Sequence, residues 1–85
     1  MKRKQILEIL HPESVALFCD GFDDCIVGLA SRFDLEPVVA YDYNKVISKL
    51  RKRDRMTEED AVEYFNVNII GAWVGNGTPI FVQTR

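Results

Sequence analysis

The sequence has few of the residues that carry covalent and metal chemistry, with two cysteines and one histidine among 85 residues. Two cysteines are too few for a disulfide scaffold. The Cys19–Cys25 spacing with one distant histidine does not match a zinc site. Because His11 stands beside Pro12, outside the main patterns, no Ser–His–Asp or Cys–His arrangement is indicated. We expect two buried free thiols, and we assign no catalytic residue, metal or cofactor.

The sequence also lacks an excess of one charge and a long apolar run. The 11 Lys and Arg residues face 13 Asp and Glu residues, for a formal net charge of −2. Nucleic acid or anionic lipid would therefore need a local patch. No stretch approaches the ~20 apolar residues of a membrane span. The basic N-terminus is followed by a run that Glu8 and His11 interrupt, unlike a signal peptide. We expect a cytoplasmic location and no membrane partner.

Hydrophobic residues make up 47% of the chain, which is typical of a globular domain. At this length we expect one α/β domain, residues 1–85. Within it, residues 1–13 are an N-terminal extension or a short helix. The helix would cover 3–10 and end before Pro12, because proline disfavours the helical conformation in the residue before it.

The first half of the chain shows two apolar runs. The run at 15–19 is apolar on both faces and predicts a central strand. A stripe at the helical period predicts a helix over 22–33. The second strand, 38–41, begins after Pro37. Because the connection is long enough for a helical crossover, these first two strands are predicted to be parallel.

The second half predicts two more helices and a strand. Asp42 is placed to cap a helix over 43–50, and Thr57 opens a helix that we extend past Phe65 to Ala72. A competing interpretation makes 67–74 a strand, turning at Asn76-Gly77 into the last strand, because Asn-Gly favours hairpins. We favour the longer helix and a final strand over 80–83. The predicted fold is a three-stranded sheet with the order (α)βαβααβ.

Aspartates at the predicted strand ends form the first candidate site. Ligands bind outside the carboxyl ends of parallel strands, and clustered carboxylates can hold Mg²⁺ or Ca²⁺. Helix capping and the helix dipole explain the same aspartates without a ligand, and we favour that explanation. The residues of this candidate ligand or partner edge are Asp20, Asp23, Asp24, Tyr41, Asp42, Asn68 and Trp73.

Asn68 and Trp73 belong to this edge through the predicted long helix. Asn68 shares a stripe with Phe65 and Ala72, so its amide should face the interior. There it would tie down neighbouring backbone or line a pocket with Asp20, Asp42 and Tyr41. We favour the first role. Trp73 is expected to be buried rather than to mark an interface.

The basic run from Lys45 to Arg55 is the second candidate. Positive charge suits a helix C-terminus, and acidic residues at 58–60 and 63 follow at once, so the two segments can compensate each other. Phosphate contact is the alternative. The residues of that nucleic-acid alternative are Lys49, Arg51, Lys52, Arg53 and Arg55.

Several segments jointly resemble a family of small, uncharacterised proteins encoded by bacteriophages and by bacteria that carry prophages. They are residues 20–24, 41–43, 57–65, 68, 71–75 and 78–80, and the resemblance covers roughly residues 14–82. It implies a small accessory protein that acts in the host cytoplasm and is dispensable to virion structure. The family brings no established activity, so no residue role follows from it.

Size, the absence of catalytic motifs and this resemblance together favour a non-enzymatic protein that binds a host or phage macromolecule. A protein partner is expected, and nucleic acid is disfavoured. A metal- or small-ligand-binding domain or enzyme that uses the acidic edge is one alternative, and a nucleic-acid-associated module is the other. A monomer and a homodimer are both allowed, because a short sheet leaves an open edge.

Overall fold

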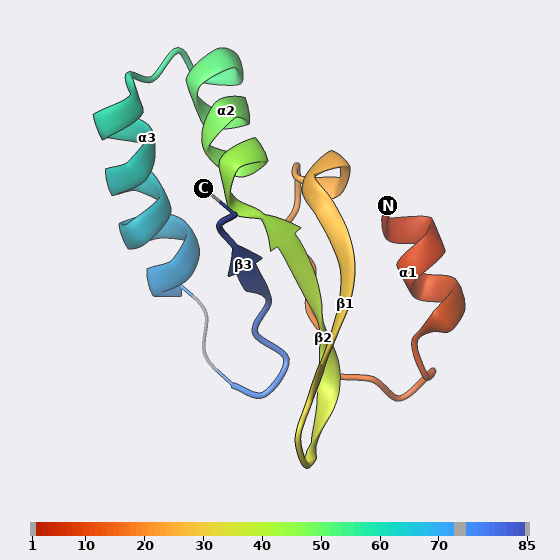
Figure 1. Cartoon of the computed structure of the whole chain (residues 1–85). Coiled ribbons are helices and arrows are strands. Elements are labelled where there is room, and N and C mark those ends of the chain that lie inside the picture. The colour runs from red at the N-terminus through yellow and green to blue at the C-terminus, as the bar shows by residue number, and fades with distance from the viewer. Residues whose placement is uncertain (1, 73–74, 85) are drawn as a thin grey trace.

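The computed structural model of the chain describes residues 2–72 and 75–84, which form a three-stranded mixed sheet and three helices (Figure 1). The predicted α/β class is confirmed, but the connectivity differs. The elements are α1 (Arg3–Ile9), β1 (Ile26–Arg32), β2 (Leu35–Asp42), α2 (Tyr43–Arg53), α3 (Glu58–Tyr64) and β3 (Ile80–Val82).

The strand order is β1–β2–β3, so β2 is the central strand. β1 and β2 pair antiparallel, with Leu29 opposite Val39, and β2 and β3 pair parallel, with Tyr41 opposite Phe81. The prediction that the first two strands are parallel is therefore wrong. Parallel pairing needs a long crossover, and here it comes later in the chain, where α2 and α3 connect β2 to β3 (Figure 1).

The predicted helix over 22–33 is also wrong. A single 3₁₀ turn over Asp23–Cys25 leads into β1, and a two-residue tip, Phe33-Asp34, turns the chain into β2. Ile26 and Val27 are β-branched, and Gly28 costs a helix interior about 1 kcal/mol. Asp34 has φ 60, a left-handed conformation that aspartate tolerates in turns. The helical spacing of the apolar residues was coincidental.

The prediction of a strand over 15–19 is wrong, because this segment is a loop that belongs to none of the three strands of the sheet. The segment instead runs beside the loop before β3, where the Leu17 N–H donates to the Gly77 carbonyl at 3.0 Å. A Cβ on Gly77 would overlap the Val15 carbonyl oxygen. Glycine is therefore required at 77 by the close approach of two backbones.

The second half of the chain follows the prediction more closely. Asp42 caps α2, accepting from the Lys45 N–H at 3.1 Å, and Thr57 caps α3, accepting from the Asp60 N–H at 3.1 Å. The helix after α3 continues in widened π-type turns over Phe65–Ile69 and a 3₁₀ turn over Ile70–Ala72. A strand over the described part of 67–74 is thus excluded.

The widened turns correct the prediction for Asn68. A π-type turn holds more residues than an α-helical one, so Ile69 joins Ala61 and Phe65 on the buried face while Asn68 is exposed. The Asn68 amide therefore does not face the interior. Trp73, which belongs to the same predicted helix, lies outside the described residues.

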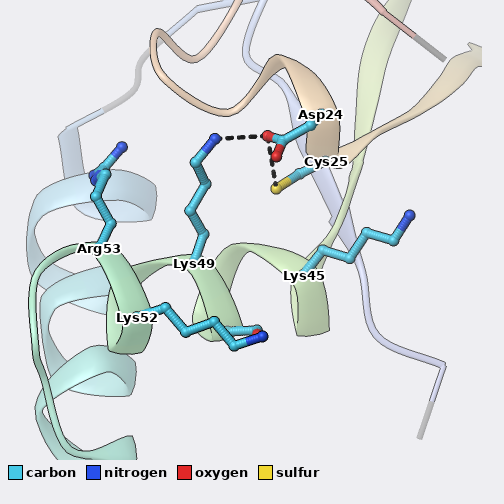
Figure 2. A pocket seen from close by; sticks show the side chains of 7 residues that line it. Asp24, Cys25, Lys45, Lys49, Lys52 and Arg53 are labelled. Carbon is cyan, nitrogen blue, oxygen red and sulfur yellow. Dashed lines mark hydrogen bonds and ion pairs between the residues drawn. The ribbon is translucent and has the colours of Figure 1, made fainter.

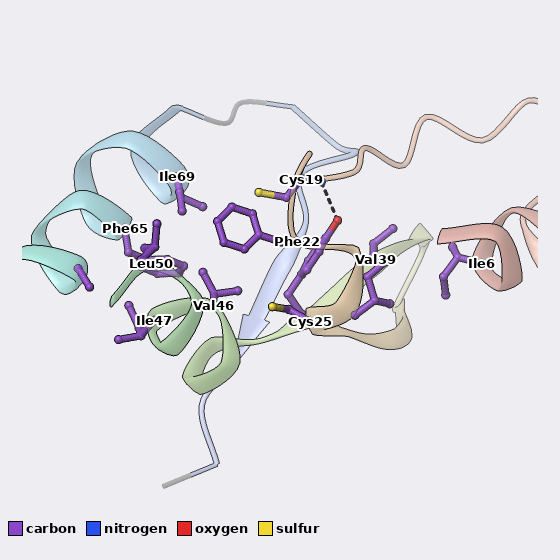
Figure 3. Close-up of a cluster of buried hydrophobic side chains, with 13 residues drawn as sticks. Ile6, Cys19, Phe22, Cys25, Val39, Val46, Ile47, Leu50, Phe65 and Ile69 are labelled. Atoms are coloured by element: carbon purple, nitrogen blue, oxygen red, sulfur yellow. Dashed lines mark hydrogen bonds between the residues drawn. The ribbon is translucent and has the colours of Figure 1, made fainter. Parts of the chain in front are cut away.

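The core is a cluster of aromatic and aliphatic side chains from the sheet, the α2–α3 pair, the loop before β1 and α1, which contributes Ile6 (Figure 3). Phe81 stacks on Tyr41, with 5.4 Å between ring centroids, and meets Phe65 edge-on at 4.9 Å. The Cys19 N–H donates to the Tyr41 hydroxyl at 2.6 Å, a buried bond that attaches the long loop to β2. Cys19 and Cys25 are buried free thiols, as predicted.

No helix among the described residues is long and apolar enough to cross a membrane.

Candidate functional site

Two adjoining open grooves lie where α1, the Asp23–Cys25 turn and α2 meet. Their volumes are about 540 and 500 Å³, and Asp24 and Lys49 line both. Figure 2 shows the first groove, with Lys49 reaching from α2 to Asp24 on the turn. We call the basic residues that line the two grooves the basic face: Lys2, Arg3, Lys4, Lys45, Lys49, Lys52 and Arg53.

The sequence of α2 explains why its cations share one side. Lys45, Lys49 and Lys52 follow the spacing of four and three residues that places side chains on one helix face. Val46, Ile47 and Leu50 occupy the other side and are buried in the core. Since the apolar stripe fixes the rotation of the helix, the lysines must point away from the core, toward the grooves.

Two aromatic rings, the buried Phe22 and the half-buried Phe18, lie against cations of the basic face. The Arg53 guanidinium lies over the Phe22 ring, 5.0 Å from its centroid, and the Lys49 ammonium lies 5.9 Å from the same centroid. The Arg3 guanidinium lies 4.7 Å from the centroid of Phe18. These cation–π contacts hold long, flexible side chains in place.

The acidic turn pairs with part of the basic face. Arg3 forms ion pairs with Asp20 at 2.9 Å and with Asp23 at 3.2 Å, and Lys49 forms one with Asp24 at 2.7 Å. The hydrogen bond from Lys49 lowers the pKa of Asp24, and the bond to Asp20 raises the pKa of Arg3. Both shifts favour the charged forms of Asp24 and Arg3.

Other members of the basic face keep their charge unpaired. No ion pair among the described residues involves Lys2, Lys4, Lys45 or Lys52. Seven basic and two acidic residues line the two grooves, although the chain as a whole carries −2. Positive charge is therefore concentrated here, and all five lysines of the sequence belong to it.

Cys25 lines the first groove but is not a reactive thiol. Burial raises its pKa to about 11, with the Asp24 carboxylate adding to the shift. The thiol is therefore protonated at neutral pH, and a protonated thiol is a poor nucleophile and metal ligand. Burial likewise raises the pKa of Cys19.

The residues of the predicted acidic edge have different roles in the structure. Asp20, Asp23 and Asp24 lie at the turn and pair with cations, whereas Asp42 caps α2 and Tyr41 is buried under the Cys19 backbone. The residues that the structure describes contain no group of three or more histidine, cysteine, aspartate or glutamate side chains that could hold a metal ion.

Only some residues of the predicted basic run line the grooves. Lys49, Lys52 and Arg53 belong to the basic face. Arg51 does not line these grooves; its guanidinium lies 3.8 Å from Glu58, the compensation between the basic and acidic segments that the sequence suggested. Arg55 also lies outside both grooves.

Sequence reasoning missed the contribution of Lys2, Arg3 and Lys4. These residues are far from α2 in the chain, and only the fold brings α1 to the Asp23–Cys25 turn. The available signal was the charge complementarity between a basic N-terminus and the aspartates at 20, 23 and 24.

The chain matches no protein-family model, no curated protein sequence and no solved structure.

Proposed function

We propose that this chain is a small, non-enzymatic phage accessory protein that binds a host or phage protein through the basic face. The observation that carries this proposal is the convergence of seven basic residues from two distant segments on two adjoining grooves. The phage context comes from the resemblance of residues 14–82, and with it the host cytoplasm as the place of action.

The charge of the face defines the partner. The unpaired ammonium groups of Lys45 and Lys52 favour a surface that carries carboxylates. Complementary charge steers such a partner to the groove and makes the association rate sensitive to salt. Asp23 and Asp24 already pair with Arg3 and Lys49, so the unpaired positive charge covers only part of the face. A protein surface with a few carboxylates fits this arrangement.

A protein partner is favoured over nucleic acid for two reasons. The carboxylates of Asp20, Asp23 and Asp24 pair with Arg3 and Lys49, which reduces the positive charge that a phosphate backbone would meet. The rings of Phe18 and Phe22 lie beneath cations, so they are not available as stacking platforms for bases. The helical spacing of Lys45, Lys49 and Lys52 still supports phosphate contact as the second candidate, and the experiment below separates the two.

The protonated state of Cys25 supports a binding role rather than nucleophilic catalysis in this groove. The groove is also open, whereas chemistry that depends on strong electrostatics favours a site that excludes water.

The test is capture from bacterial host lysate by the tagged full chain, with and without nuclease, read by quantitative mass spectrometry. Lys45→Glu/Lys52→Glu reverses two unpaired charges of the basic face. Arg51→Glu/Arg55→Glu is the matched control, because it makes the same charge change in the same run outside the grooves. We expect one nuclease-resistant protein to be lost only with the first variant.

Two results would overturn the proposal in different ways. A captured protein that both variants retain would place binding elsewhere on the molecule. Capture that nuclease abolishes, and that the Lys45→Glu/Lys52→Glu variant loses, would replace the protein partner with nucleic acid.

A further inference from the structure

The hairpin tip carries an aromatic side chain with no contact to cover it. Phe33 is 98% exposed, and its neighbour Leu35 is 49% exposed. Figure 1 shows the β1–β2 hairpin projecting away from the α2–α3 pair. A phenylalanine buries about 150–250 Å² when it is covered, so this residue offers a large apolar contact at the most prominent point of the sheet.

A small apolar groove lies further along the same hairpin, beside the end of α1. It has a volume of about 210 Å³. Its apolar lining residues are Ile9, Leu10, Leu29 and Pro37, and its polar ones are His11, Ser14 and Glu36. An apolar cavity of about 150 Å³ is enough to hold a benzene molecule. The groove therefore has the size and the apolar lining that suit one phenyl ring.

Phe33 cannot fill the groove of its own chain. Phe33 is four positions from Leu29, or about 13 Å along a strand, and its exposed ring lies outside this groove. A second chain, lying antiparallel to the first hairpin, can place its tip at this position. In a two-fold arrangement each chain would insert one ring and receive one, because a two-fold interface uses the same patch on both chains.

The rim of the groove offers a polar partner for the tip. The Glu13 N–H donates to His11 Nδ1 at 3.1 Å, so in the neutral imidazole the proton is on Nε2. Asp34, next to Phe33, is an acceptor. The His11 Nε2–H of one chain is thus a suitable donor to the Asp34 carboxylate of the other.

We propose that the protein forms a two-fold dimer in which Phe33 of each chain occupies the groove between α1 and the hairpin of the other. Two rings and the groove surfaces that they cover bury roughly 600–1,000 Å² in total, below the ~1,200 Å² of a standard stable interface. The dimer is therefore weak and depends on concentration. The dimer groove uses the C-terminal end of α1, whereas the basic face uses its N-terminal end, and the two proposals share no residue.

The test is sedimentation velocity of the full chain from about 10 μM to about 1 mM, a range in which a weak dimer changes population. We expect a monomer–dimer equilibrium that Phe33→Ala weakens at least about tenfold, as for a central aromatic anchor. Val67→Ala, at a residue that is 63% exposed on the helix after α3, should leave it unchanged.

A second pair of variants tests the groove. Ile9→Arg blocks it, whereas Leu7→Arg places the same charge on the same helix outside its lining. Ile9 and Leu7 are 59% and 57% exposed, so both variants should fold. We expect only Ile9→Arg to weaken the dimer. Mixing the Phe33→Ala and Ile9→Arg chains should give heterodimers that are weaker than the wild-type dimer but stronger than either variant's homodimer, because one intact ring still meets one intact groove.

A wild-type protein that stays monomeric over the whole concentration range would overturn the proposal, because Phe33 would then not mediate self-association. So would a dimer that Phe33→Ala leaves intact, or one that Ile9→Arg and Leu7→Arg weaken equally. Open-ended growth in place of a dimer would contradict the two-fold arrangement.

Discussion

Phe22 and Phe33 show how the two ends of the molecule differ. Phe22 is 5% exposed and lies under the cations of Lys49 and Arg53, so the basic face is built directly on the core. Phe33 is 98% exposed at the hairpin tip and supports nothing in its own chain. The same residue type therefore serves stability at one end and is available for recognition at the other, and burial alone decides which.

The largest expected effect tests this contrast directly. Phe22→Ala should lower the free energy of unfolding by about 3–5 kcal/mol, because it leaves a cavity and removes the support of two cations. Phe33→Ala, measured in dilute solution where the chain is monomeric, should change it by less than about 0.5 kcal/mol. Urea denaturation of both variants measures the difference, and equal destabilisation would remove the distinction between the two ends.

The second effect concerns the bond that attaches the loop before the basic face to the sheet. Tyr41→Phe leaves the buried Cys19 N–H without its acceptor, and we expect a loss of about 1–3 kcal/mol at neutral pH. A Tyr41→Phe protein as stable as wild type would show that this attachment contributes little.

The same residue predicts a dependence on alkaline pH. Burial raises the pKa of Tyr41 to about 12, so the folded protein retains this proton above the usual tyrosine range near 10. This contribution to stability is complete below about pH 10 and is lost as the pH rises toward 12. Denaturation between these values should show a shallower decline in Tyr41→Phe than in wild type, and parallel declines would contradict the assignment.

The parts of the fold that the sequence predicted correctly have local causes. The caps at Asp42 and Thr57 and the buried stripe of α2 can be read from neighbouring residues. The helix over 22–33 was predicted wrongly because its apolar spacing suits a helix, while the competing β preferences of Ile26 and Val27 are weak and depend on context. The role of Asn68 depended on widened turns that carry no sequence signal.

In the candidate site, too, the sequence predicted what neighbouring residues determine and missed what depends on the fold. The contributions of Lys49, Lys52 and Arg53 could be predicted, since they lie within one basic run. The exclusion of Arg51 from the grooves depends on how α2 is rotated against the core, and Arg55 lies beyond the end of α2. Pairing of Arg3 with Asp20 and Asp23 joins segments about 20 residues apart, a separation that local patterns do not encode.

A small loss of stability is expected at the ion pair between Lys49 and Asp24. Lys49→Ala should cost less than about 1 kcal/mol, because exposed pairs contribute little. It should also move the pKa of Asp24 up toward its ordinary value, since Lys49 is the main cause of the lowering. Asp24 stabilises the fold above its unfolded-state pKa, and that contribution is lost as the pH falls through its folded pKa. NMR titration of the Asp24 carboxyl tests this, with Lys45→Ala as the control that leaves it unchanged.

Chemical modification of the lysines is the most direct test of the proposed function, because all five belong to the basic face. Acetylation removes their charge, whereas reductive methylation retains it. We predict that, in nuclease-treated host lysate, native and methylated protein capture the same partner and acetylated protein does not. An acetylated protein that is still folded by circular dichroism and captures the partner as well as native protein would contradict the proposal.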